Sequence, residues 1–191
     1  MNIEKLKELR EKTNVSMNAC RKALEESSGD MDKAIKILKT KSLMVAGDVS
    51  EKSTSEGKIC SYIHPGNKLA VLLEVQCETD FAARSEDFNQ FCESVYLQIA
   101  GMSPIYLSRD QVDDDKYKDQ REIFTAQVKD KPEKIQEKII EGKFNKWFGD
   151  VCLLEQKLVQ DNDKTVKQLR DELIGKLREN VVIKRFVRWE I

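Results

Sequence analysis

Apolar residues recur at helical spacing through the first forty residues of the chain. The pattern predicts three short helices, with apolar positions at Ile3, Leu6 and Leu9, then Met17, Cys20, Ala23 and Leu24, then Met31, Ala34, Ile35 and Leu38. The first helix should end before Thr13-Asn14, and Ser16 and Asp30 can cap the second and third. Helices this short are marginal alone, so we expect them to pack together as a small docking domain over residues 1–42.

A different pattern follows the third helix. Residues 43–57 are rich in Ser, Gly and Glu and show no sustained period, which is typical of a linker. Residues 58–64 and 69–77 then read as two strands, and Pro65-Gly66-Asn67 between them has the chemistry of a tight turn. The sequence therefore predicts a linker that leads into a β-hairpin.

Helical periods return after the hairpin. Apolar residues in the stretch 80–101 recur at steps of three, four or seven, and Ser85 can cap its main part. Ser108-Arg-Asp-Gln111 is a capping-box signature that predicts another helix, and the acidic run 113–115 suits a helix N-terminus. Ile105-Tyr106-Leu107, just before that signature, is expected to be a short extended piece.

The last third of the chain predicts two more helices and a strand. The helices begin near Pro132 and Thr165. The terminal segment VVIKRFVRWE is β-branched and aromatic, so we expect a strand that rejoins the early hairpin. Helices segregated from a small antiparallel sheet make residues 58–191 an α+β domain.

Composition narrows the possible functions. Lys and Arg (33) nearly balance Asp and Glu (34), for a net charge of −1, whereas domains held to nucleic acid by charge are usually distinctly basic. His64 is the single histidine, which excludes multi-histidine metal sites. The charged N-terminus is no signal peptide, and no apolar run approaches a membrane span. We expect a cytoplasmic protein that needs no metal or cofactor and contacts neither nucleic acid nor membrane.

The chain offers little chemistry for an enzyme. The five cysteines show no Cys-x-x-Cys spacing and are expected to be buried or half-buried free thiols. A Cys–His64 pair is not excluded by spacing, but no known nucleophile motif surrounds it. The basic and aromatic alternation in 184–189 fits a nucleic-acid surface or a half-buried strand, and the absence of net positive charge favours the strand. We therefore expect no enzyme.

The segment Cys77-Glu78-Thr79-Asp80-Phe81-Ala82-Ala83-Arg84 joins a predicted strand to a predicted helix. Thr79 or Asp80 can cap the new turn. Burial would stabilise Phe81 by about 1.5–3 kcal/mol, so physical chemistry alone favours a core position. The alternative is an Asp–Phe pair held rigidly outward, where it could anchor a partner protein.

The same segment, extended back to Glu74, closely resembles the signature of the elongation factor Ts family. A second similarity lies in the N-terminal blocks Leu9-Arg-Glu-Lys-Thr13 and Cys20-Arg-Lys-Ala-Leu24, and shorter ones continue to Arg185-Phe-Val-Arg188. The usual Val after the Phe is Ala82 here, and Asn18 and Ala19 replace family residues in the N-terminal motif. The resemblance covers the whole chain in order and matches the short form with one core subdomain.

This resemblance implies a function and a mechanism. The family promotes release of GDP from elongation factor Tu, and its N-terminal domain is ubiquitin-associated-like. By resemblance, Arg10, Met17, Asn18 and Arg21 would grip the GTPase domain of Tu. Asp80 and Phe81, within the motif Thr79, Asp80, Phe81, Ala82 and Arg84, would wedge near the magnesium and phosphate site so that GDP leaves. The short form also implies a homodimer.

Two other functions remain open from the sequence. The N-terminal helices could read Tu or a ubiquitin-like partner as an adaptor, with no effect on nucleotide exchange. A cysteine-dependent enzyme is the other alternative, and it would need an activated thiol, for which the sequence gives no sign.

Overall fold

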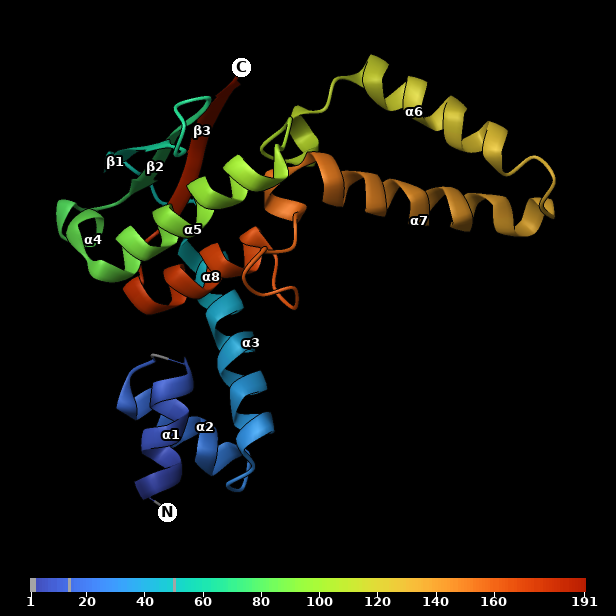
Figure 1. Ribbon diagram of the computed structural model, residues 1–191. Helices are drawn as coiled ribbons and strands as arrows, with labels where there is room; N and C mark the ends of the chain where they lie inside the picture. The colour runs from blue at the N-terminus through green and yellow to red at the C-terminus, as the bar shows by residue number, and fades with distance from the viewer. Residues whose placement is uncertain (1–2, 14, 50) are drawn as a thin grey trace. The chain divides into compact units, whose positions relative to one another are not determined.

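The computed structural model describes residues 3–13, 15–49 and 51–191. Asn14, expected in the loop between the first two helices, and residue 50 of the expected linker lie outside the described residues. Along the chain the elements are α1 (Ile3–Thr13), α2 (Met17–Glu26), α3 (Met31–Val49), β1 (Glu56–Ile63), β2 (Leu69–Cys77), α4 (Asp80–Arg84), α5 (Glu86–Met102), the 3₁₀ turn η1 (Arg109–Gln111), α6 (Asp114–Gln127), α7 (Glu133–Val151), η2 (Leu153–Glu155), α8 (Val166–Leu177) and β3 (Val181–Glu190) (Figure 1).

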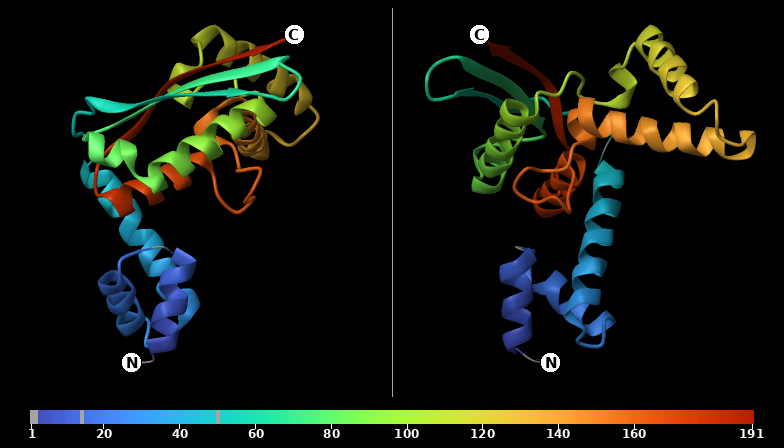
Figure 2. Two further views of the ribbon diagram at one scale, coloured as in Figure 1. Left: turned by 60° about the vertical axis from the view of Figure 1, so that its left-hand side comes forward. Right: turned by 45° about the vertical axis from the view of Figure 1, so that its right-hand side comes forward.

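The strands form one small antiparallel sheet in the order β1-β2-β3 (Figure 2). The hairpin closes where the His64 N–H donates to the Leu69 carbonyl at 2.9 Å. At the far end of the chain, the Ile191 N–H donates to the Lys68 carbonyl at 2.9 Å, which pairs β3 with β2. The α+β class and the strand that rejoins the hairpin are therefore confirmed.

The chain divides into two compact units. The first comprises residues 1–59, 74–92 and 168–184, and the second comprises residues 60–73, 93–167 and 185–191. The predicted division into 1–42, 43–57 and 58–191 stays a prediction. In the described part of the chain, no helix is both long and apolar enough to cross a membrane.

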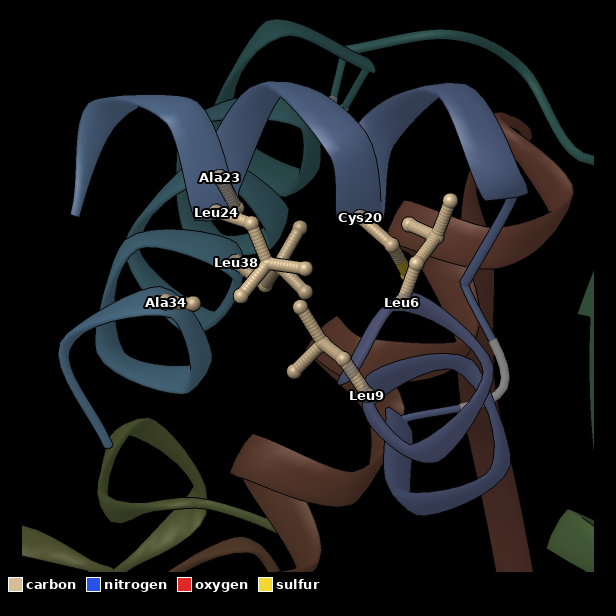
Figure 3. Packing of buried hydrophobic residues seen from close by; sticks show 7 residues of the cluster. All are labelled: Leu6, Leu9, Cys20, Ala23, Leu24, Ala34 and Leu38. Atoms are coloured by element: carbon tan, nitrogen blue, oxygen red, sulfur yellow. The ribbon is translucent and has the colours of Figure 1, made fainter. Parts of the chain in front are cut away.

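The first unit holds the predicted three-helix cluster. Its buried side chains come from α1, α2 and α3 and point toward one another: Leu6, Leu9, Cys20, Ala23, Leu24, Ala34 and Leu38 (Figure 3). The Ser16 hydroxyl accepts a hydrogen bond from the Ala19 N–H (3.3 Å), and the Asp30 carboxylate accepts one from the Lys33 N–H (3.0 Å). Both predicted caps are confirmed.

Helix α3 is longer than the sequence pattern indicated. It continues to Val49, so residues 43–49, which were expected to belong to an irregular linker, are helical. Ala46 and Val49 are buried, and this burial supports the last two turns. Gly47 does not break the helix, because tertiary contacts routinely override the weak propensity of one residue.

In the second unit, α6 and α7 pack against each other as a helical hairpin (Figure 2). Phe144 is at its centre: it stacks on Tyr117 with ring centroids 4.5 Å apart and meets Phe124 edge-on at 5.1 Å. The helix predicted after Pro132 is confirmed, because Pro132 directly precedes the first residue of α7. Offset and edge-on aromatic pairs add to simple burial, so this hairpin carries its own core.

The predicted capping box at Ser108 is wrong. Ser108 makes no capping side-chain hydrogen bond, and only the short turn η1 follows it. The Gln111 side chain instead accepts from the Leu107 N–H at 3.0 Å, which leaves it unable to serve the predicted cap. Helix α6 begins later, at Asp114, where the acidic run occupies its first turn as expected. Within the expected extended piece, Tyr106 forms a parallel bridge with Cys152, whereas Ile105 and Leu107 on either side of it lie at bends.

Candidate partner-binding site

The junction between β2 and α4 is formed by Thr79. Thr79 has extended backbone angles (φ −128°, ψ 157°), and its hydroxyl oxygen accepts a hydrogen bond from the Ala82 N–H at 3.2 Å. This is the geometry of an N-cap. Of the two residues that could cap this turn, Thr79 is the one that does so.

Phe81 projects into solvent. Its exposed fraction is 82%, so the core position favoured by burial energy is wrong and the ring lies outside the core, as the alternative required. The reason is the helix face: Ala82 and Ala83 are both buried, so their side of the short helix α4 faces the protein. Phe81 is left on the open side.

A charge pair flanks the exposed ring. The Arg84 guanidinium lies 3.1 Å from the Asp80 carboxylate, one helical turn apart, and both side chains are partly exposed. Exposed pairs of this kind contribute little to stability, about 0.3–0.5 kcal/mol. The Asp80–Arg84 pair and the exposed Phe81 ring therefore lie together on α4, and the ion pair adds little to the stability of the fold.

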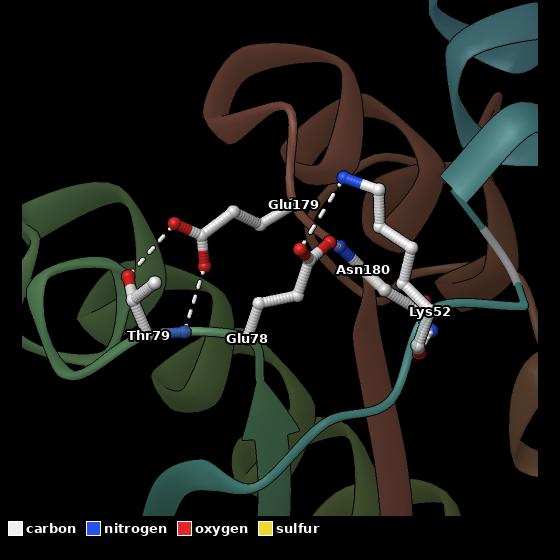
Figure 4. A network of polar contacts seen from close by, with 5 residues as sticks. All are labelled: Lys52, Glu78, Thr79, Glu179 and Asn180. Carbon is white, nitrogen blue, oxygen red and sulfur yellow. Dashed lines mark hydrogen bonds and ion pairs between the residues drawn. The ribbon is translucent and has the colours of Figure 1, made fainter.

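The motif is held in place by Glu179, Asn180 and Lys52, three residues that the sequence did not identify. The Glu179 carboxylate accepts from both the backbone N–H (3.0 Å) and the hydroxyl (2.7 Å) of Thr79, and Glu78 accepts from the Asn180 N–H at 2.7 Å (Figure 4). Lys52 pairs with Glu78 at 3.3 Å. No local pattern could have identified Glu179, because it lies 100 residues from Thr79.

The N-terminal candidates lie on α1 and α2. Arg10 is exposed on α1, and Met17, Asn18 and Arg21 are exposed on the first turns of α2. The Arg21 guanidinium donates to the Asn18 side-chain oxygen at 3.1 Å, which holds these two polar groups together beside Met17. A partly apolar, partly cationic patch on a helix start suits contact with another protein.

The groups considered for catalysis have ordinary surroundings. His64 is exposed, and its Nδ1 shares a 2.7 Å hydrogen bond with the Tyr62 hydroxyl, an ordinary setting for a histidine at the protein surface. Burial raises the pKa of the Cys77 thiol, and the nearby Glu179 carboxylate raises it further. Burial also raises the pKa of Cys152 to about 11. A nucleophilic thiol needs a lowered pKa, so neither cysteine is activated.

Among the described residues, no group of three or more His, Cys, Asp or Glu side chains is placed to hold a metal ion. The arrangement around Thr79 is a hydrogen-bonded turn that carries one exposed aromatic ring.

Comparison of the whole sequence with known proteins points to the same family that the motif resembles. A family model described as "Elongation factor TS" matches residues 2–191. The chain belongs to the elongation factor Ts family. The Elongation factor Ts of Desulforamulus reducens is 45% identical over 188 residues, covering 97% of this chain and 87% of that protein. Those of Thermotoga petrophila and Thermotoga maritima are each 44% identical over 191 residues, covering all of this chain and 96% of each relative.

Membership in the elongation factor Ts family makes this chain a factor of translation elongation. The match spans the chain from its N-terminal helices to β3, so both the patch on α2 and the motif at Thr79 lie within it. The partner implied by the family is elongation factor Tu.

Proposed function

We propose that this chain is a guanine-nucleotide exchange factor that binds elongation factor Tu in its GDP-bound form and promotes release of GDP. Asp80 and Phe81 enter the GTPase domain of Tu near the magnesium and phosphate site. The observation that carries the proposal is Phe81, a large apolar side chain that is 82% exposed on a fixed turn. Exposed aromatic rings on rigid elements are the usual anchors of protein interfaces.

Exchange by this route needs no bond to be made or broken. A factor that binds nucleotide-free Tu more tightly than Tu with GDP must weaken GDP binding by the same ratio, because binding free energies are reciprocal. Magnesium neutralises phosphate charge, so a disturbed magnesium site removes much of the nucleotide's affinity. One ring can displace packed helices because they move between discrete arrangements. As a translation factor, the chain is proposed to act in the cytoplasm.

The α2 patch is proposed to provide affinity rather than exchange. Met17, Asn18 and Arg21, with Arg10 on α1, would hold the GTPase domain through the docking domain (1–42), joined by the linker 43–57 to the core 58–191. The exposure of these side chains and the Asn18–Arg21 hydrogen bond support this assignment. The two contacts act as in a bivalent binder, in which binding through the α2 patch raises the effective concentration of Phe81 at its own site on Tu.

The test is release of fluorescent GDP from purified Tu as this chain is added. Wild-type protein should accelerate release, and Phe81→Ala should lower the second-order rate of release by at least about 30-fold, as loss of an interface anchor of about 2 kcal/mol requires. Its thermal melt should match that of wild type, because an exposed side chain contributes little to stability. Ile123→Ala, an exposed apolar residue of α6, is the matched control and should keep full activity.

Two results would overturn this proposal. Full exchange activity in Phe81→Ala would remove the role of the ring. Binding of wild-type protein to Tu with no change in the GDP off-rate would favour an adaptor over an exchange factor.

A homodimer is the second part of the proposal, and the open face of the sheet supports it. Tyr62 stacks on Tyr96 of α5 (5.4 Å), and Arg188 donates toward the Ala100 carbonyl of α5, so these residues face the helix. Their strand neighbours Ile63, Val187 and Trp189 point the other way and are exposed. An apolar face of this kind is typical of an interface.

Sedimentation equilibrium tests the dimer directly. Wild-type protein should sediment at twice the chain mass, and Trp189→Glu should shift it toward monomer, because a buried unpaired charge is costly at an interface. Ile123→Glu is the control, since it adds the same charge to an exposed apolar site on α6. A monomeric wild-type protein would refute the dimer and leave the exchange proposal standing.

A further inference from the structure

The Glu179 side chain contacts Thr79 of the candidate motif, although the two residues are 100 positions apart in the sequence. It lies between α8, which ends at Leu177, and β3, which begins at Val181. Both of its carboxylate oxygens are used: Oε2 accepts from the Thr79 backbone N–H at 3.0 Å, and Oε1 accepts from the Thr79 hydroxyl at 2.7 Å (Figure 4). Hydrogen bonds to an ionised acceptor are roughly twice as strong as neutral ones.

The contact is reciprocal between two short segments. Glu179 accepts from the N–H of Thr79, and Glu78, the residue before Thr79, accepts from the N–H of Asn180 at 2.7 Å. The Asn180 side chain also donates to the Lys52 carbonyl at 2.8 Å, and Lys52 pairs with Glu78. Residues 78–79 and 179–180 are therefore fastened to each other from both sides.

This arrangement fixes the orientation of the Thr79 hydroxyl. Because the hydroxyl donates its hydrogen to Glu179, its lone pairs are left for the Ala82 N–H, which it accepts at 3.2 Å as the N-cap of α4. The Thr79 carbonyl is held as well, by the Cys77 thiol at 3.2 Å and by the Ala83 N–H at 3.2 Å. Each polar group of Thr79 thus has a defined partner.

Phe81 depends on this turn for its position. The ring is exposed, so no packing around it determines where it points. Helix α4 has five residues, too few to be stable alone, and its start is set by Thr79. A binding group that is ordered in advance costs less conformational entropy when the partner arrives.

We propose that Glu179 is a positioning residue for exchange: its carboxylate, by holding both the N–H and the hydroxyl of Thr79, keeps Phe81 in the orientation that enters Tu. The inference rests on the proposed function. Without this carboxylate the α4 turn samples other orientations, and only a fraction of molecules is competent to bind. The apparent dissociation constant rises by the reciprocal of that fraction.

The test is the same GDP-release assay, analysed as a titration. Glu179→Ala should raise the concentration that gives half-maximal release by about tenfold, as expected if about one molecule in ten stays competent. The rate at saturation should stay near that of wild type, because the ring itself is intact. Glu179→Gln keeps one acceptor oxygen, so its half-maximal concentration should lie between those of wild type and Glu179→Ala. If Glu179→Ala fails to fold, Glu179→Gln is tested in its place. Its half-maximal concentration should rise by about threefold, the geometric midpoint between no change and a tenfold rise.

Glu155→Ala is the matched control for a purely structural effect. Glu155 also uses both carboxylate oxygens, on the Arg109 guanidinium at 3.0 and 2.9 Å, but lies in the second unit. Its loss should lower thermal stability and leave the half-maximal concentration unchanged. A Glu179→Ala protein that behaves like Glu155→Ala would overturn the inference.

The Phe81→Ala background separates this inference from the proposed function. If Phe81→Ala loses exchange, adding Glu179→Ala should lower it no further, because the residue being positioned is gone. Additive losses would refute positioning through Phe81. If Phe81→Ala alone keeps full exchange, the proposed role of the ring fails, and the Glu179 inference fails with it.

Discussion

Gly57 gives the most direct test of how closely β1 must approach β2 in the hairpin. It lies in β1 with φ +151°, a backbone angle that L-residues rarely adopt. A Cβ added there would overlap the Val75 carbonyl oxygen of β2 and lie 2.7 Å from the Gln76 Cα. These are backbone atoms, so no side-chain rotation can relieve the overlap, and β1 would have to move away from β2.

Gly57→Ala should destabilise the protein by about 2–4 kcal/mol. Forcing an alanine into this backbone conformation costs about 1–3 kcal/mol. A displaced strand also loses at least one interstrand hydrogen bond, worth about 1 kcal/mol. Urea unfolding followed by circular dichroism measures the change in the free energy of unfolding.

Gly142→Ala is the matched control for this substitution. Gly142 lies within α7, and a Cβ there would meet no atom within 4 Å. The same chemical change should therefore stabilise the protein by about 0.5–1 kcal/mol, because alanine loses less backbone entropy than glycine in a helix. If the free energy of unfolding of Gly57→Ala lies within about 0.5 kcal/mol of the wild-type value, the close approach of β1 to β2 does not constrain the hairpin and the reasoning is wrong.

Three further results are expected. The Gln98 side chain donates to Gln156 Oε1 (3.1 Å) and accepts from the Val159 N–H (3.0 Å). Gln98→Leu removes both hydrogen bonds and should therefore lower the free energy of unfolding, measured in urea, by about 3 kcal/mol or more. A loss below about 1 kcal/mol would contradict this expectation. The buried Cys152 thiol stays neutral up to about pH 11 in the folded state but ionises from about pH 9 once unfolded, so its stabilising contribution is lost as pH rises through this window. The stability gap between wild type and Cys152→Ala should therefore shrink from pH 8 to pH 11 in urea titrations, and a constant gap would refute the assignment. Met17→Ala should weaken binding to nucleotide-free Tu about tenfold by calorimetry with an unchanged melt, whereas unchanged affinity would remove α2 from the interface.

Local features of the fold were predictable because the interactions that create them are local. Ser16, Asp30 and Ser85 cap helices by bonding to an N–H three residues on, and a sequence displays that spacing directly. The same reasoning failed at Ser108, where Gln111 bonds to Leu107 instead. It also failed at 43–49, where the burial of Ala46 and Val49 extends α3.

The sequence by itself determined the three apolar stripes of the N-terminal helices, the hairpin, the α+β class and the cap at Thr79 or Asp80. Only the tertiary structure decided that Phe81 faces solvent, because that depends on which side of α4 buries Ala82 and Ala83. It also decided how the motif is held. The carboxylate that fixes Thr79 comes from Glu179, 100 residues away, and only the pairing of β3 with β2 brings it there.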